Sequence, residues 1–197
     1  MSDKSSIANL ALQLLGETPD IVDVDTDDTK HANEIKSAWD ATLDAALAEH
    51  SWRFALVRAA WPASATAPAW GFAKAYPFAA DPYCLDVVRL DPLRHGDLPG
   101  TWDVVGREVH ADEDPPLYVE YIARVTDPAR FHPMFVEFFA AKLAEKIAFR
   151  VTGKANLAPD MREYRKELQR DARWKSAVAS GRSSARDGDF LSSRSVP

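Results

Sequence analysis

Apolar residues near the N-terminus recur at intervals of three and four, the spacing of an amphipathic helix. The first stripe predicts a helix over residues 5–15 and consists of Ile7, Leu10, Ala11, Leu14 and Leu15. A second stripe predicts a helix over residues 28–50 and consists of Ile35, Ala38, Trp39, Thr42, Leu43, Ala46 and Leu47. Asp27 or Asp28 is the expected N-cap of the second helix. We expect the two helices to pack against each other.

Residues 52–124 have a different pattern, in which short runs with strand-like alternation are separated by prolines. Long helices are excluded here by Pro62, Pro68, Pro77, Pro82, Pro92 and Pro99. Gly106-Arg107 is the expected two-residue turn of a hairpin between the runs TWDVV and EVHAD. The run LYVEYIA, residues 117–123, is apolar on both faces. We therefore expect this strand to be covered on both sides.

Helical spacing returns after residue 132. Residues 133–151 are apolar around most of a helix circumference, which predicts a helix buried on nearly all sides. A further helix is expected over residues 159–177, with Met161, Tyr164, Leu168 and Ala172 on one face. Its expected outer face carries charges of both signs, namely Arg162, Glu163, Arg165, Lys166 and Glu167.

The predicted fold class is therefore α+β. A bundle of about four helices, two N-terminal and two C-terminal, would have a small antiparallel β region over residues 52–124 inserted between them. Residues 1–178 would form a single domain. Residues 179–197 are rich in glycine, serine and arginine, the composition of a flexible C-terminal tail.

One apolar pair interrupts this polar tail. An apolar anchor among charged residues is typical of a segment that becomes ordered when it binds a partner. Trp174, in the preceding helix, is a second candidate, because tryptophan is enriched at protein interfaces. The predicted partner-binding residues are Trp174, Arg182, Arg186, Phe190, Leu191 and Arg194.

Charge and cysteine content narrow the function classes. The chain has 197 residues and a formal net charge of −6, which disfavours nucleic-acid binding through a broad basic face. Passage of DNA close to the protein is compatible with that charge. Cys84 is the only cysteine, so no intramolecular disulfide can form. No apolar run approaches the length of a membrane span, and no membrane partner is expected.

One acidic loop has the spacing of a calcium site. Asp23, Asp25, Asp27 and Glu34 stand where the first, third, fifth and twelfth ligands of a calcium loop would lie. However, Asp28 occupies the position where the sharp turn of such a loop needs glycine. We therefore interpret the loop as a solubilising and helix-capping segment and predict neither a metal nor a cofactor.

No set of side chains predicts catalysis. The histidines are His31, His50, His95, His110 and His132, and none pairs with a metal ligand at a typical spacing. His50 is expected to favour the C-terminal dipole of the second helix, and His132 to cap the third. Cys84 lies in an apolar run, typical of a buried and unreactive thiol. Glu120 and Asp112 could form a catalytic carboxylate pair only if the fold brings them together. We predict no catalytic residue and a protein that is not an enzyme.

The order of these elements suggests a family. The segments His50–Phe54, Tyr76–Asp91 and Gly106–Gly153 follow one another with the spacing of a Trp-x-Phe segment, a tyrosine-rich run with a strand, a hairpin, and a strand leading through an Asp-Pro turn into a helix. In this the chain resembles the tail tubular protein A, or head-to-tail adaptor, of short-tailed phages. The resemblance covers about residues 5–178 and depends on order and spacing together.

The resemblance implies a structural protein of the virion, made in the host cytoplasm. Adaptors of that family form rings, commonly dodecamers, between the portal protein and the tail nozzle or tail fibre proteins. Genome DNA passes through the lumen without sequence-specific binding, and an acidic wall would keep DNA from adhering. Two alternatives stay open: a cell-wall (peptidoglycan) hydrolase associated with the tail, and a head-completion connector of a long-tailed phage.

Overall fold

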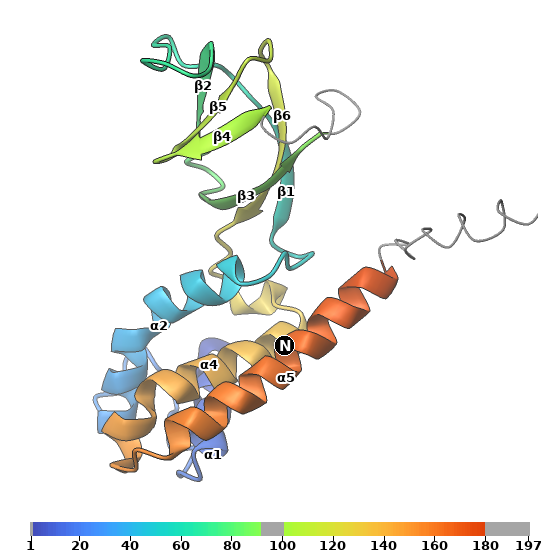
Figure 1. Ribbon diagram of the computed structural model, residues 1–197. Coiled ribbons are helices and arrows are strands. Elements are labelled where there is room, and N and C mark those ends of the chain that lie inside the picture. Colours follow the sequence, from blue (N-terminus) through green and yellow to red (C-terminus); the bar gives the residue numbers. More distant parts are fainter. Residues whose placement is uncertain (1, 92–100, 180–197) are drawn as a thin grey trace, which may run out of the picture.

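The computed structural model describes residues 2–91 and 101–179. Within these ranges the helices lie at one end of the molecule and the strands at the other (Figure 1). The helices are α1 (Lys4–Leu14), α2 (Lys30–Ala48), α4 (Pro133–Thr152) and α5 (Leu157–Ala179), with the short 3-10 helix η1 (Pro128–Arg130) before α4. The strands are β1 (Leu56–Trp61), β2 (Lys74–Pro77), β3 (Cys84–Leu90), β4 (Trp102–Val105), β5 (Glu108–Ala111) and β6 (Leu117–Ala123).

The predicted mixture of α and β structure is confirmed for the described residues, with four α-helices and two small antiparallel sheets. The helix ends differ from the predicted ends by one or two residues. The last helix continues to Ala179, so the first residue assigned to the tail is helical. The tail residues Arg182, Arg186, Phe190, Leu191 and Arg194 lie outside the described residues.

Short-range hydrogen bonds explain where the first two helices begin. Asp3 caps α1 in a reciprocal capping box with Ser6. Thr29 caps α2, and its Oγ1 accepts a hydrogen bond from the backbone N–H of Ala32 at 3.1 Å. The prediction of Asp27 or Asp28 as this cap is wrong. The Asp27 carboxylate instead accepts a hydrogen bond from the backbone N–H of Val22 at 2.8 Å and so closes the preceding loop.

Helix α4 begins at the predicted residue and ends one residue later than predicted. The Nδ1 atom of His132 accepts a hydrogen bond from the backbone N–H of Met134 at 3.2 Å, which confirms the predicted capping role. Pro133 follows at the first helical position, where its missing N–H costs no hydrogen bond. Gly153 ends the helix with φ 71°, in the left-handed region that favours glycine.

Helix α4 is the centre of the helical layer. Its buried side chains face several directions around the helix: Phe135, Phe138, Phe139, Ala140, Ala141, Lys142, Leu143, Ala144, Ile147 and Ala148. The extensive contacts between helices in the described chain all involve α4, which packs against α1, α2 and α5. The expected packing of α1 against α2 is not among these extensive contacts. Each instead buries its apolar stripe against α4, which offers more apolar surface than either partner.

The strands form two three-stranded antiparallel sheets. Sheet A has the order β1-β6-β3 and sheet B the order β2-β5-β4. The predicted hairpin is the β4-β5 pair, with Val105 opposite Glu108. Gly106 has φ 62° and is the turn residue that requires the left-handed region.

The two sheets enclose a second apolar cluster, separate from the one among the helices. Its largest members are Trp61, Tyr76 and Tyr121, and it includes Cys84 and Val109. Trp61 ends β1 and is buried. Trp39 and Trp52 are buried in the helical cluster.

Strand β6 is covered on both sides along only part of its length. Leu117, Val119 and Tyr121 face the cluster between the sheets. On the opposite face only Ile122, near the end of the strand, joins the helical cluster. Tyr118 and Glu120 on that face remain partly exposed. The prediction of complete cover is therefore wrong for the half of sheet A that lies beyond the helices.

The packing around α4 generates a stability prediction with an internal control. Phe139 is fully buried and lies edge-to-face with Trp39 at 4.9 Å between ring centroids. Phe149, on the same helix, is 64% exposed. We expect Phe139→Ala to lower the free energy of unfolding by about 3–5 kcal/mol, and Phe149→Ala to change it by about 0.5 kcal/mol or less. Urea unfolding followed by circular dichroism measures both. Equal effects would contradict the central position of α4.

Candidate functional site

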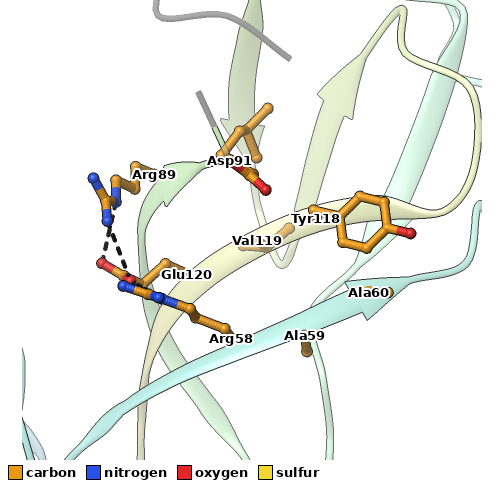
Figure 2. A pocket seen from close by; sticks show the side chains of 9 residues that line it. Arg58, Ala59, Ala60, Arg89, Asp91, Tyr118, Val119 and Glu120 are labelled. Atoms are coloured by element: carbon orange, nitrogen blue, oxygen red, sulfur yellow. Dashed lines mark hydrogen bonds and ion pairs between the residues drawn. The ribbon is translucent and has the colours of Figure 1, made fainter. Parts of the chain in front are cut away.

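The uncovered half of sheet A carries a row of alternating charges. Arg58 on β1 and Arg89 on β3 both stand opposite Glu120 on β6. The Nε atom of Arg58 donates to Glu120 at 2.6 Å and that of Arg89 at 3.2 Å. Glu120 therefore lies between two guanidinium groups and fixes the direction of both (Figure 2).

The two arginines determine the charge of Glu120. Its side chain is 12% exposed, and burial alone would raise its pKa. The hydrogen bonds from Arg58 and Arg89 outweigh burial, so the pKa of Glu120 lies below its ordinary value. The carboxylate stays ionised at neutral pH. Arg58, whose side chain is 79% exposed, presents the end of its guanidinium group to solvent.

A depression of about 470 Å³ lies over this row. Beside the charged residues its lining includes Ala59, Ala60, Tyr118 and Val119, from the two neighbouring strands β1 and β6 (Figure 2). Ala60 leaves room above the sheet because its side chain is short. The surface thus combines an apolar shelf with two oriented guanidinium groups and the carboxylates of Glu120 and Asp91. We call this surface the outer face of sheet A and define it by Arg58, Ala60, Arg89, Tyr118 and Glu120.

A second polar group, the Glu145 cluster, fixes helix α5 to the rest of the helical layer. Glu145 of α4 accepts hydrogen bonds from the Nε atoms of Arg162 at 2.9 Å and Arg165 at 3.0 Å. Arg165 also pairs with Glu49, just after α2, at 3.0 Å. Glu49 in turn pairs with the Nζ atom of Lys142 at 3.0 Å. The Glu145 cluster therefore links α2, α4 and α5 through these five residues.

Arg165 was expected on the solvent-facing side of α5, and this expectation is wrong. Its side chain is largely buried, and its guanidinium group lies 5.8 Å from the ring centroid of Phe138. Lys142 is also buried, and this burial lowers its pKa. The hydrogen bond to Glu49 offsets part of that decrease. Charge alone cannot separate a solvated arginine from one that pairs with acids on two other helices.

The Glu145 cluster fixes which side of α5 faces outward. Met161, Leu168 and Ala172 join the helical apolar cluster, as predicted. At 100° per residue, Trp174 lies on the opposite side of the helix from these three residues. Trp174 is 68% exposed. Figure 1 shows α5 running back beside α4.

The structure places the acidic loop residues in local contacts. Asp25 pairs with Lys4, and Asp23 accepts a hydrogen bond from the backbone N–H of Asp25 at 2.9 Å. Glu34, the twelfth position of the loop pattern, pairs with Arg150 of α4 at 3.1 Å. No group of three or more histidine, cysteine, aspartate or glutamate residues in the described ranges is arranged to hold a metal ion.

Among the described residues, His31 and His110 pair with nearby acids. His31 pairs with Asp20 at 3.0 Å, and His110 pairs with Glu108 at 3.4 Å. His95 lies outside the described residues.

His50 packs edge-to-face on Trp52 at 4.9 Å. Burial, and to a lesser degree the charge of Arg173, lower its pKa. Both effects favour the neutral imidazole, so the predicted role as a cation at the end of α2 is not supported.

The residues considered for catalysis lie apart. Cys84 is fully buried, and burial raises the pKa of its thiol to about 12, as expected for an unreactive cysteine. Glu120 lies on sheet A, whereas Asp112 follows β5 of sheet B. The Asp112 carboxylate accepts a hydrogen bond from the backbone N–H of Ala73 at 2.8 Å. The structure does not bring these two carboxylates together.

Of the predicted partner-binding residues, Trp174 is therefore the one that the structure describes, and it is exposed. The sequence-based prediction missed Arg58, Arg89 and Glu120. Their alternation with apolar neighbours on three strands was visible in the sequence, but only the pairing register joins them into one row.

None of the helices in the described residues is both long and apolar enough to span a membrane. Comparison of the chain with protein-family models and with curated proteins found no match.

The Glu145 cluster generates a pH prediction. Burial opposes ionisation of Glu145, but Arg162 and Arg165 outweigh it and hold its pKa below the ordinary value of 4.5. The stability that Glu145 contributes is therefore fully present above pH 4.5 and is lost as pH falls through the lower, folded-state pKa. Glu145→Gln should lower the free energy of unfolding by about 1–3 kcal/mol at pH 7. The difference in unfolding free energy between wild type and Glu145→Gln should narrow below about pH 4.5.

Urea unfolding at a series of pH values tests this prediction. The matched control is Glu163→Gln, which changes an exposed glutamate paired with Lys166 on the same helix. Its unfolding midpoint should match wild type throughout the pH range. A constant gap between wild type and Glu145→Gln from pH 7 to pH 3 would contradict the role of the cluster.

Proposed function

We propose that this chain is a head-to-tail adaptor of a phage virion, which forms a ring between the portal protein and the tail. The ring would be a homo-oligomer, commonly a dodecamer in the family that the sequence resembles, and genome DNA would pass through its lumen. The partners would be the portal on one side and tail nozzle or tail fibre proteins on the other. Supporting features are the order and spacing of the sequence segments and the exposed surfaces of α5 and sheet A.

One observation carries this proposal beyond the resemblance: Trp174 stands on the outward side of a helix that is fixed by ion pairs. A large exposed aromatic side chain on a rigid helix is the typical anchor of a protein interface, because little conformational entropy is lost when it binds. The flanking charged residues keep the helix soluble before assembly.

The net charge supports the same function. At −6 the chain carries the charge sign of DNA. A channel wall of like charge repels the phosphate backbone and allows it to slide. Residues that would bind DNA through phosphate contacts are basic and clustered, whereas the exposed arginines of sheet A alternate with Glu120.

The hydrolase alternative has less support. A glycosidase that uses two carboxylates needs one with a raised pKa to act as general acid. The pKa of Glu120 is lowered, because two arginines hold its carboxylate. The long-tailed connector differs from our proposal only in its neighbours in the virion.

The first test is assembly on the portal. Mixed with the portal protein of the same virus, the chain should form rings visible by mass photometry and negative-stain microscopy. Trp174→Ala should weaken assembly by about tenfold or more. Trp70→Ala is the matched control, since Trp70 is 87% exposed in a loop and should have no effect. A wild-type protein that stays monomeric and unbound beside its portal would contradict the proposed function.

The second test concerns residues 180–197. Truncation after Ala179 keeps α5 whole and removes Arg182, Arg186, Phe190, Leu191 and Arg194. If these residues bind the portal, the melting temperature should stay within about 2 °C of the full chain while attachment to the portal weakens. In a ring, a small loss of binding free energy per chain adds up over all the subunits that contact the portal. Equal attachment of the truncated and full-length chains would show that this segment is not an anchor.

A further inference from the structure

The outward side of α5 carries more than Trp174. Glu163, Glu167, Arg170 and Trp174 follow one another at spacings of four, three and four residues, so they lie within about 60° of one another around the helix. We call these four residues the α5 stripe. The three charged side chains are each mostly exposed. The stripe presents two carboxylates at one end and an indole ring at the other.

The outer face of sheet A offers two guanidinium groups and an apolar shelf, beside the carboxylate of Asp91, which lines the same depression. Glu120 neutralises part of the charge of Arg58 and Arg89, but it is largely buried and holds both guanidinium groups in place. The exposed end of Arg58 is therefore a pre-oriented cation. Ala60 and Tyr118 stand one pleat further along the sheet, as directly opposed residues of β1 and β6, and form an apolar shelf in the depression of about 470 Å³.

The two surfaces match in spacing as well as in charge. Glu167 and Trp174 are seven residues apart, or about 10 Å along a helix. The charged row and the Ala60–Tyr118 shelf are about 7 Å apart along a strand, and the length of an arginine side chain covers the difference. With Glu167 at Arg58, the indole ring of Trp174 reaches the shelf, where it meets the short side chain of Ala60 and the aromatic ring of Tyr118.

We infer that the α5 stripe of one copy of this chain docks on the outer face of sheet A of the next copy. This inference rests on the proposed ring and names its subunit interface. The occupant is a second copy because the same chain presents both complementary surfaces, on different elements. A contact between two different patches is heterologous and repeats from copy to copy, which is the arrangement that closes a ring.

Disulfide trapping between two variants, each with one added cysteine, tests this interface directly. Ala60→Cys places a thiol on the shelf, and Arg170→Cys places one on the stripe while leaving Trp174 intact. Both positions are exposed, so both variants should fold. The native Cys84 is buried and should not react. The full chains are assembled with the portal protein, oxidised and separated on a non-reducing gel.

The expected result is a crosslinked dimer in the mixture of the two variants and none with either variant alone. A variant with both cysteines should give a ladder that extends to the full ring. As an independent check, Arg58→Glu and Glu167→Arg should each reduce ring formation at least tenfold, and the double variant should recover most of it. Arg53→Glu, at another exposed arginine, is the control for added negative charge.

The outcomes separate this inference from the proposed function. Rings without a crosslink, and without rescue by the charge exchange, would overturn the interface and leave the adaptor function standing. The absence of rings and of portal binding for the wild-type chain would overturn both. A crosslink that requires the mixture, with rescue of the charge-exchanged pair, supports both.

Discussion

The fold depends on one constraint: helix α4 is apolar around most of its circumference and must be covered on several sides. A surface helix buries one stripe, but α4 buries side chains that point in several directions. Helices α1, α2 and α5 each cover one side of it. The stacked rings of Phe135 and Phe139, with Trp39 and Trp52 at their edges, fill the space that remains. Any arrangement that uncovered α4 would expose several aromatic side chains to water.

Ion pairs contribute to the contact between α4 and α5. Helix α5 packs on the helical cluster through Met161, Leu168 and Ala172, and the ion pair between Arg165 and Glu145 joins it to α4. Partly buried ion pairs add less net stability than apolar packing, but they require a specific geometry. They fix the rotation of α5 about its own axis and therefore the direction in which Trp174 points. The polar cluster thus determines which residues of the helix are available to a partner.

Local rules predicted much of the fold. The spacing of apolar residues located four helices, His132 and Gly153 marked the ends of α4, and Gly106 marked the hairpin. The sequence-based predictions that failed concern relations between distant segments. The pairing of α1 and α2 with α4, the burial of Arg165 and the row of Arg58, Glu120 and Arg89 all depend on contacts between residues far apart in the chain. Periodicity describes one element at a time and carries no information about its neighbours.

The same limit applies to the candidate site. Trp174 could be predicted as an interface residue from its type and position, whereas the surface proposed to receive it could not. The most direct measurement is a cryo-EM reconstruction of the chain assembled with its portal protein. The account predicts a closed ring between the portal and the tail side, with Trp174 of each subunit buried against β1 and β6 of the next. A ring in which Trp174 faces solvent, or a chain that does not assemble with the portal, would contradict it.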